Sequence, residues 1–355
     1  MSEPGGAATP EQVFVAASRA LDGVAADGVD RLPEATRQLE SVAPELAAIV
    51  GSAGVRAQLD IHRRCSAEAR VQRRRLVREG TVANLCLLTA GLLSASVLVG
   101  PMLSARLGPE TWRLIALGIG FVTLALGAAT ATFSYVARES DRLRRWLAMR
   151  GAAEVARLDA FKAIAAAAVV AGPTTAAAAF ALVVRYLFDD QRRWLADRAA
   201  EHRASADRTN LLGGIATALA FVGGSGAVVA GFVPEQGWIA IAGVAGAAVM
   251  AYAMSREGLR RDRANADLYE KTAVALDQLA VRVDPVVAEI GAGRVEAMPA
   301  FVAAVAGLLE TGHRQWLDGA AQAEATLAAF DARLKELGGA GPRPGTPDGG
   351  GQPGR

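Results

Sequence analysis

Residues 80–105 read GTVANLCLLTAGLLSASVLVGPMLSA, and residues 114–137 read LIALGIGFVTLALGAATATFSYVA. Neither stretch contains Asp, Glu, Lys, Arg or His, and each exceeds the roughly 20 apolar residues that cross a hydrocarbon core as a helix. Residues 209–234 and 236–255 lack the same residue types. The pattern predicts an all-α membrane protein with four transmembrane helices in two hairpins. The alternative is the core of a large soluble helical protein.

Basic residues lie on one side of these stretches. Arginines gather before the first hairpin, between the hairpins and after the second, whereas residues 106–113 and Glu235 at the two tips carry few charges. Because positive residues stay on the cytoplasmic side, both termini and the central segment are expected to be cytoplasmic. Four aromatic side chains are candidate anchors at the membrane interfaces: Trp112, Tyr135, Trp238 and Tyr252.

The remaining sequence predicts long helical extensions on the cytoplasmic side. Apolar residues recur at helical spacing before the first hairpin and after the second. Each half reads as a charged helix, a spanning hairpin and a second charged helix, which indicates a tandem duplication. The expected segments are an N-terminal helical segment, a first repeat, an Ala-rich connector, a second repeat, C-terminal amphipathic helices and a disordered Gly/Pro-rich tail, at residues 1–54, 55–160, 161–185, 186–283, 284–337 and 338–355.

The Ala-rich stretch 163–184 allows two interpretations. It is apolar enough to suggest a fifth spanning helix, but Gly172-Pro173 interrupts it. A single crossing there would also place the arginines of residues 138–150 and of residues 192–208 on opposite sides of the membrane. We therefore favour two packed cytoplasmic helices joined at Gly172-Pro173.

No pattern in the sequence predicts catalysis. The histidines His62, His202 and His313 are isolated, and Cys65 and Cys86 have no metal-ligand spacing. Phosphate-binding loops and nucleophile motifs are absent. A formal net charge of +2 gives no reason to expect a nucleic-acid partner. The sequence thus predicts a protein that is not an enzyme and uses no cofactor, with the lipid bilayer as its first partner.

Small and hydroxyl-bearing residues are the candidate functional positions of the apolar stretches. Small residues at four-residue spacing let helix backbones approach closely, either within a hairpin or between chains of a homo-oligomer. We expect a homo-oligomer here. The candidate packing positions are Gly120, Gly223, Gly243 and Ala247. Hydroxyls either bond back to their own helix or line a weakly polar pore. The candidate pore-lining residues are Ser94, Thr123, Thr130 and Thr217.

The second half carries a recognisable pattern: Tyr186, Gln191 and Trp194 before its hairpin, Glu270 after it and Trp316 in the last helix. This pattern resembles the SLATT family of two-transmembrane effector domains associated with SMODS and SLOG proteins. The resemblance implies a pore-forming or membrane-perturbing effector of the bacterial cytoplasmic membrane, in anti-phage defence, with a nucleotide-signalling or sensing partner encoded separately. The alternative is a non-conducting anchored scaffold whose cytoplasmic helices recruit partners.

Overall fold

The computed structural model describes residues 8–22, 28–98, 100–139, 142–230 and 239–339, and every regular element in them is a helix. The chain divides into two units, Met1–His313 and Arg314–Arg355. All contacts described below belong to the first unit. The prediction of an all-α fold is confirmed for the described residues.

The N-terminal segment forms short helices, and the three α-helices among them have a proline at their first or second residue. They are α1 (Pro10–Asp22), the 3₁₀ turn η1 (Val29–Arg31), α2 (Leu32–Leu39) and α3 (Pro44–Val50). Proline suits the first turn of a helix because its missing N–H would have no intrahelical partner there. Each of these elements buries one apolar side, for example Leu32 and Leu39 on α2.

The helix α4 (Ala53–Val97) then runs without a break from a charged half into an apolar half. Ser52 caps its N-terminus, where the Ser52 Oγ accepts a hydrogen bond from the Val55 amide at 3.4 Å. The predicted spanning stretch 80–105 is not one helix, because α4 ends at Val97 and a separate α5 (Gly100–Leu107) follows. Gly100-Pro101 explains the break, since proline cannot continue an existing helical ladder.

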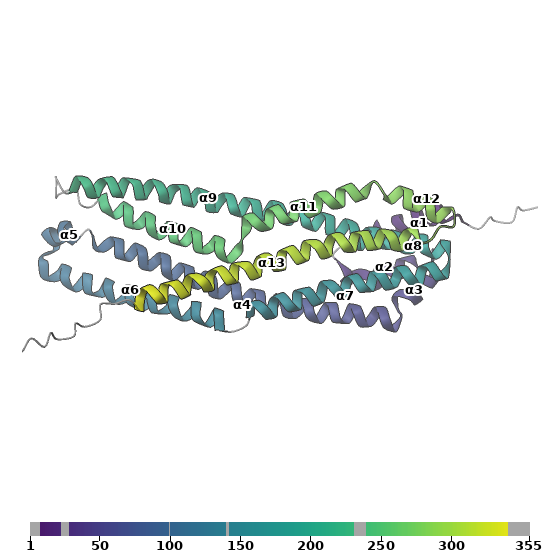
Figure 1. Ribbon diagram of the computed structural model, residues 1–355, viewed down its shortest axis with the longest axis horizontal. Coiled ribbons are helices and arrows are strands. Elements are labelled where there is room, and N and C mark those ends of the chain that lie inside the picture. Colours follow the sequence, from purple (N-terminus) through teal and green to yellow (C-terminus); the bar gives the residue numbers. More distant parts are fainter. Residues whose placement is uncertain (1–7, 23–27, 99, 140–141, 231–238, 340–355) are drawn as a thin grey trace, which may run out of the picture. The chain divides into compact units, whose positions relative to one another are not determined.

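Two long helices pack along α4, as Figure 1 shows. They are α6 (Pro109–Glu139) and α7 (Arg142–Ala171). Gly108 separates α5 from α6 with a φ of +84°, and Gly172 separates α7 from α8 with a φ of +110°. Both turns need the left-handed region that glycine enters without steric cost. The stretch 163–184 therefore contains two packed helices joined at Gly172, as the favoured interpretation expects, while their cytoplasmic location stays a prediction.

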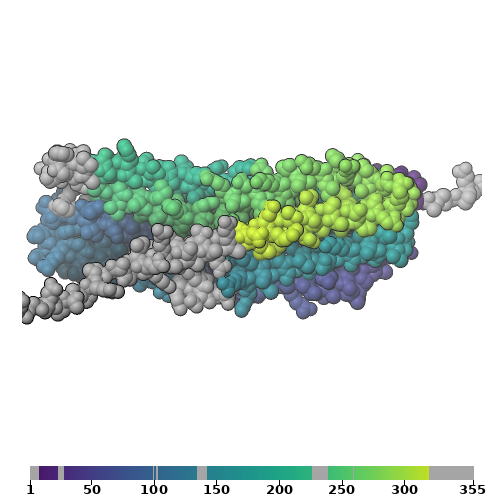
Figure 2. All heavy atoms as spheres, in the orientation of Figure 1, coloured from purple at the N-terminus to yellow at the C-terminus, as the bar shows by residue number. Residues whose placement is uncertain are grey.

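The second half repeats this arrangement. After α8 (Pro173–Val183) the chain makes a π-helical turn, η2 (Val184–Asp189), and continues as α9 (Asp190–Ala230). Then α10 (Ala240–Arg260) and α11 (Asp262–Ala280) pack along α9 in succession, just as α6 and α7 pack along α4 (Figure 1). In the space-filling view the side chains of α9, α10 and α11 form one continuous surface (Figure 2).

The main core lies at the end of α4 and α9 that is remote from α5 (Figure 1). It joins the N-terminal helices, α7, α8, η2, α11, α12 (Val283–Gly291) and the start of α13 (Ala297–Gly339). Phe180 lies at its centre, with its ring centroid 5.2 Å from that of Phe301 and 5.8 Å from that of Phe14. Every residue of α8 from Thr175 to Val183 is buried, so its continuous apolar run serves this core.

Candidate membrane module and its polar junction

Two helices of the described chain, α4 and the Pro109–Phe133 part of α6, are long and apolar enough to cross a membrane. The apolar window of α6 has none of its residues buried, and that of α4 has 17% buried. Leu114, Leu117, Phe121 and Leu124 share one face of α6, and each has at least 70% of its surface exposed. A soluble protein rarely exposes a contiguous apolar surface of this kind, whereas lipid tails would cover it.

The third and fourth predicted spans are not confirmed, because residues 231–238 lie outside the described chain and the described parts of α9 and α10 alone do not meet the length and apolarity of a span. Both α9 and α10 are rich in alanine and glycine, which gain little on leaving water. They nevertheless expose large apolar side chains, among them Phe221 at 79% and Met254 at 68%. The predicted tip of this hairpin, including Pro234 and Trp238, lies outside the described residues.

Small residues allow very close approach between the helices of this module. A Cβ added at Gly223 on α9 would lie 1.9 Å from the Gly243 nitrogen on α10. A Cβ at Gly246 would lie 2.6 Å from the Ala216 carbonyl oxygen, and one at Gly91 on α4 would lie 2.4 Å from the Ala248 Cβ. Two predicted packing positions, Gly223 and Gly243, thus meet each other within one chain.

The other two predicted packing positions contact no neighbouring helix closely. A Cβ at Gly120 would meet nothing within 4 Å, and Ala247 is exposed. Four-residue spacing from Gly243 leads to Ala247, whereas the structure uses Gly246, three residues away, which also lies on the same face of a helix.

The candidate pore-lining hydroxyls do not converge within one chain. The Thr217 Oγ1 donates to the Gly213 carbonyl at 2.9 Å, and the Thr130 Oγ1 donates to the Leu126 carbonyl at 2.9 Å. Both bonds stay within their own helix, as hydroxyls in apolar helices commonly do, but the Thr130 Oγ1 also donates to the Ala83 carbonyl of α4 at 3.4 Å. Ser94 is exposed, while the Thr123 Oγ1 is buried and has no hydrogen-bond partner.

The predicted interface aromatics are partly described. Trp112 is half-buried near the start of α6 and packs on Gly100, where an added Cβ would lie 2.7 Å from the indole Nε1. Tyr252 is half-buried on α10. The side chain of Tyr135 and the whole of Trp238 lie outside the described residues.

A set of polar side chains, of which Asn84 and Asp262 are buried, joins the two hairpins at the base of the apolar segments. We call it the polar junction, and it consists of Asn84, His202, Ser205, Ser255, Arg256 and Asp262. The Ser255 Oγ on α10 donates to the Asn84 Oδ1 on α4 at 2.6 Å. This contact was not predicted from the sequence, although a lone asparagine within the apolar stretch 80–105 is a signal for an interhelical hydrogen bond.

Asp262 is the centre of the junction, with only 1% of its side chain exposed. It is the first residue of α11, where the positive end of the helix dipole favours a carboxylate. The His202 Nδ1 lies 2.7 Å from the Asp262 Oδ1, and the Ser205 Oγ donates to the Asp262 Oδ2. These bonds tie α9 to the α10–α11 turn and satisfy a carboxylate that would be costly to bury alone.

The geometry of these three residues differs from that of a hydrolytic triad. In a triad the histidine accepts the serine proton while the carboxylate orients the histidine from its other side. Here the carboxylate stands between them and receives both groups. The arrangement is therefore suited to holding helices together.

A second charged cluster links α4 to α7. Arg142 pairs with Glu79, and Glu154 pairs with the Arg150 Nη2 at 2.6 Å and with the Arg157 Nη2 at 2.7 Å. Burial by itself would raise the pKa of Glu154, but the two guanidinium groups outweigh it and hold that pKa below its usual value. Arg157 is almost fully buried, so this cluster holds a paired guanidinium and carboxylate inside the helix bundle.

Arginines without an ion-pair partner among the described residues lie around the polar junction. Arg74 and Arg78 on α4, Arg145 on α7, Arg208 on α9 and Arg260 on α10 are all exposed, and none makes an ion pair with a described residue. Contacts across the junction, such as Arg263 with Asn210 at 2.8 Å, place these positions close to the inner ends of the apolar segments. We call these five residues the arginine collar. Free guanidinium groups in this position suit anionic lipid headgroups.

The family-like motif divides between the core and the surface. Tyr186 is fully buried in η2, and burial raises the pKa of its phenol. Trp194 packs edge-on against Tyr269 at 5.6 Å, while Arg150 and Arg198 each lie 5.8 Å from its ring.

The other three motif residues make different contacts. Gln191 is buried, and its Nε2 donates to the Asp190 Oδ2 at 3.4 Å. Glu270 is exposed and pairs with Arg203. Trp316 belongs to the second unit. The buried members of the motif therefore support the helix bundle.

Comparison of the chain with models of known protein families finds no match, and neither do comparisons with curated proteins and with solved structures.

Proposed function

We propose that this chain is an integral membrane effector that perturbs or opens the bilayer when its cytoplasmic helices receive a signal. The main support for the proposal is the exposed apolar face of α6, which lies next to α4. The apolar segments of both helices end near the arginine collar. Apolar helices with basic residues at one end match the charge distribution of cytoplasmic-membrane proteins.

The topology we propose has four spans in two hairpins, with both termini in the cytoplasm. The duplicated arrangement of α4, α6 and α7 and of α9, α10 and α11 supports it, because equivalent helices would then cross together. In the described residues α9 and α10 each carry large exposed apolar side chains, and α10 packs against α4. The resemblance of residues 186–317 to the SLATT family adds support for an effector of this kind.

Conduction would need several chains. Ser94 and Thr217 face outward from the single chain, and the free faces of α6 and α9 remain available to neighbouring copies. We therefore propose a homo-oligomer in which outward hydroxyls of adjacent chains line a path. A separately encoded nucleotide-signalling or sensing protein is the proposed source of the signal.

A non-conducting anchored scaffold is the second candidate, and two observations favour it. The hydroxyl of Thr217 bonds to its own helix and that of Thr130 to its own helix and to α4, and Gly223 and Gly243 are already used within one chain. In that case the apolar hairpins would only fix the cytoplasmic helices to the membrane.

Measuring the membrane potential separates the two candidates. Cells that overproduce the protein are compared, by voltage-dye fluorescence, with cells holding equal amounts of a variant in which Ser94 and Thr217 are replaced by alanine. An effector should depolarise the membrane and conduct in planar bilayers after purification, and the variant should alter the leak. A scaffold leaves the potential and the bilayer conductance unchanged in both.

Topology has its own test. In a cysteine-free background, a single cysteine at Pro109 should react with an impermeant reagent in intact cells, and one at Gly172 should not. Labelling at position 172 contradicts the four-span topology.

A further inference from the structure

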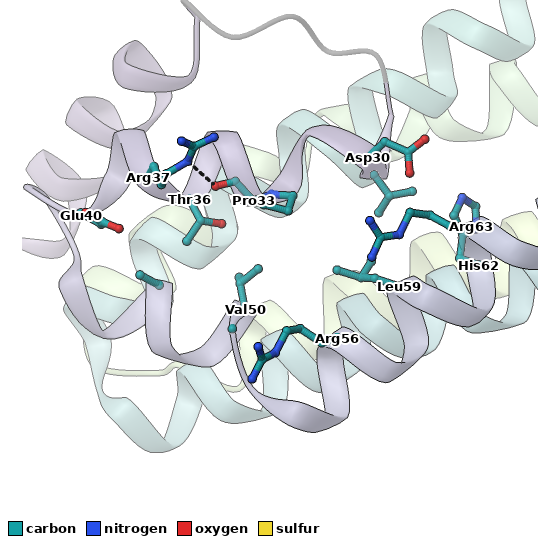
Figure 3. A pocket seen from close by; sticks show the side chains of 13 residues that line it. Asp30, Pro33, Thr36, Arg37, Glu40, Val50, Arg56, Leu59, His62 and Arg63 are labelled. Atoms are coloured by element: carbon teal, nitrogen blue, oxygen red, sulfur yellow. Dashed lines mark hydrogen bonds between the residues drawn. The ribbon is translucent and has the colours of Figure 1, made fainter.

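A cavity of about 260 Å³ lies between the N-terminal helices and the first turns of α4. Its walls come from α2, α3 and α4, as Figure 3 shows. Pro33, Val50 and Leu59 provide much of its apolar surface. Ligand pockets are commonly concave and mostly apolar with a few polar groups, with volumes of about 300–1,000 Å³. This cavity is slightly smaller than that range, so it suits a small ligand of one or two rings.

Arginines supply the cationic groups of this cavity. Arg56 and Arg63 lie seven residues apart on α4, which places them on one face with their Cα atoms about 10 Å apart along the helix. Leu59 lies between them, and Figure 3 shows the two side chains entering from different sides. Arg37 from α2 also lines the cavity.

Much of this positive charge is available to a ligand. Arg56 makes no ion pair or side-chain hydrogen bond with a described residue. The Arg37 Nε makes one long bond, at 3.4 Å, to the Pro33 carbonyl, and Arg63 pairs with Asp60. Asp30 and Glu40 also line the cavity, and with Asp60 on Arg63 the three arginines are balanced by three carboxylates. Arg56 and Arg37 nevertheless form no ion pair with a described residue, and guanidinium forks match phosphate and carboxylate oxygens.

We infer that this cavity binds a small organic anion that has an apolar body and a phosphate or carboxylate group. The apolar body lies against Leu59, Val50 and Pro33, and the anionic group meets Arg56 or Arg63. Both features are required together, because an apolar body alone leaves the guanidinium groups unsatisfied and an inorganic anion alone leaves the apolar wall exposed to water.

Occupancy of the cavity acts on the membrane module through α4. One uninterrupted helix carries Arg56 at the cavity and Val97 at the end of the apolar segment, about 60 Å apart at 1.5 Å per residue. His62 lines the cavity and also places its Nδ1 2.8 Å from the Ala153 carbonyl of α7, so a ligand that contacts His62 reaches α7 through this one side chain. This second part of the inference rests on the proposed membrane function, whereas binding itself does not.

Calorimetry tests the binding site. The full chain in nanodiscs of zwitterionic lipid is titrated with 1-naphthyl phosphate, 1-naphthoate, inorganic phosphate and 1-naphthol, with empty nanodiscs as the blank. At least one of the two naphthyl anions should bind at least about tenfold more tightly than inorganic phosphate and 1-naphthol. The tighter of the two anions identifies phosphate or carboxylate as the ligand group.

Variants place the binding in this cavity. The double variant Arg56→Gln and Arg63→Gln should lose at least about tenfold in affinity, because two charge-assisted contacts are removed. Arg64→Gln is the matched control, since Arg64 is equally exposed on α4 but does not line the cavity. Arg56→Lys keeps the charge without the planar fork and should retain part of the affinity. Equal losses in the double variant and the control, no binding of either naphthyl anion, or equal binding of 1-naphthol would each overturn the site.

Dye leakage from proteoliposomes tests the action on the membrane. The better naphthyl anion should change the leak rate of the wild-type protein and leave that of the double variant unchanged. Binding without any change in a measurable leak overturns the action through α4. A protein that binds the anion but never leaks contradicts the proposed membrane function while the binding site stands.

Discussion

Replacing Gly223 with alanine is expected to force α9 and α10 apart. The new Cβ would lie 1.9 Å from the nitrogen of Gly243 and 2.2 Å from its Cα, whereas non-bonded carbon atoms are comfortable at about 3.5–4.0 Å. Both of these Gly243 atoms belong to the backbone, so no side chain can rotate away. The helices must therefore separate by roughly 1.5 Å, and overpacking of this kind typically costs about 1–3 kcal/mol.

The neighbouring Gly224 provides the control. A Cβ at Gly224 would meet nothing within 4 Å, and both glycines lie in the same helical turn. Each substitution gains about 1 kcal/mol of helix propensity, so this contribution cancels when the two variants are compared. Gly223→Ala should then be less stable than Gly224→Ala by about 1–3 kcal/mol, which corresponds to roughly 2–12 °C in the midpoint of thermal unfolding.

Circular dichroism of the purified variants in the same detergent measures this difference. Loss of helical signal on heating gives the two midpoints at equal protein concentration. Equal midpoints would falsify the claim that α9 and α10 meet at Gly223, because the contact could then not be closer than an ordinary one.

Three further predictions concern buried polar groups. Asp262→Ala should cost about 3–5 kcal/mol in chemical denaturation, because it leaves the partners of a buried carboxylate unsatisfied; a loss below 1 kcal/mol would show that the polar junction is not needed for stability. Stability against thermal unfolding should also decrease on acidification, in two separate pH ranges. Burial lowers the pKa of His62, so the unfolded state takes up a proton first, and stability should fall as the pH drops below about 6.5. The pKa of Glu154 is lowered despite burial, so its contribution is present above about pH 4.5 and disappears as the pH falls through its folded value. The first decrease should be smaller in His62→Gln and the second in Glu154→Gln, and an unchanged pH profile in both variants contradicts the assignment. Thr123→Val should be neutral or stabilising because the Thr123 hydroxyl is buried without a partner, whereas Thr130→Val should cost about 1 kcal/mol, and the same unfolding measurement would reveal the opposite order.

Much of the helical framework follows from the sequence because its signals are local. Proline at the starts of α2, α3 and α8, and glycine at position 172, fix helix ends through backbone chemistry alone. The passage of α4 from charged to apolar sequence is visible for the same reason, since nothing between Ala53 and Val97 interrupts a helix.

The contacts between helices were harder to predict because they join positions far apart in the chain. Asn84 and Ser255 are separated by 171 residues, and no periodicity records which helix faces which. Gly246 was missed because spacing within one helix does not show where the partner backbone approaches. Asp262 is buried by the sharp turn at Arg261, which has a φ of +51° that its residue type does not favour.

The π-helical turn η2 has a consequence for how this sequence tolerates insertions and deletions. A π turn holds one residue more than the corresponding α turn, so removing one residue between Val184 and Asp189 would convert it to regular α-helix. Because the wider turn already accommodates the extra residue, the residues after it would keep nearly the same direction relative to α8. Leu195 and Ala199 on α9 would then stay buried. In contrast, removing one residue from the regular α-helix between Asp190 and Leu195 would rotate everything after it by about 100°. Single-residue deletions should therefore be tolerated within Val184–Asp189 and not in the next turn of the helix.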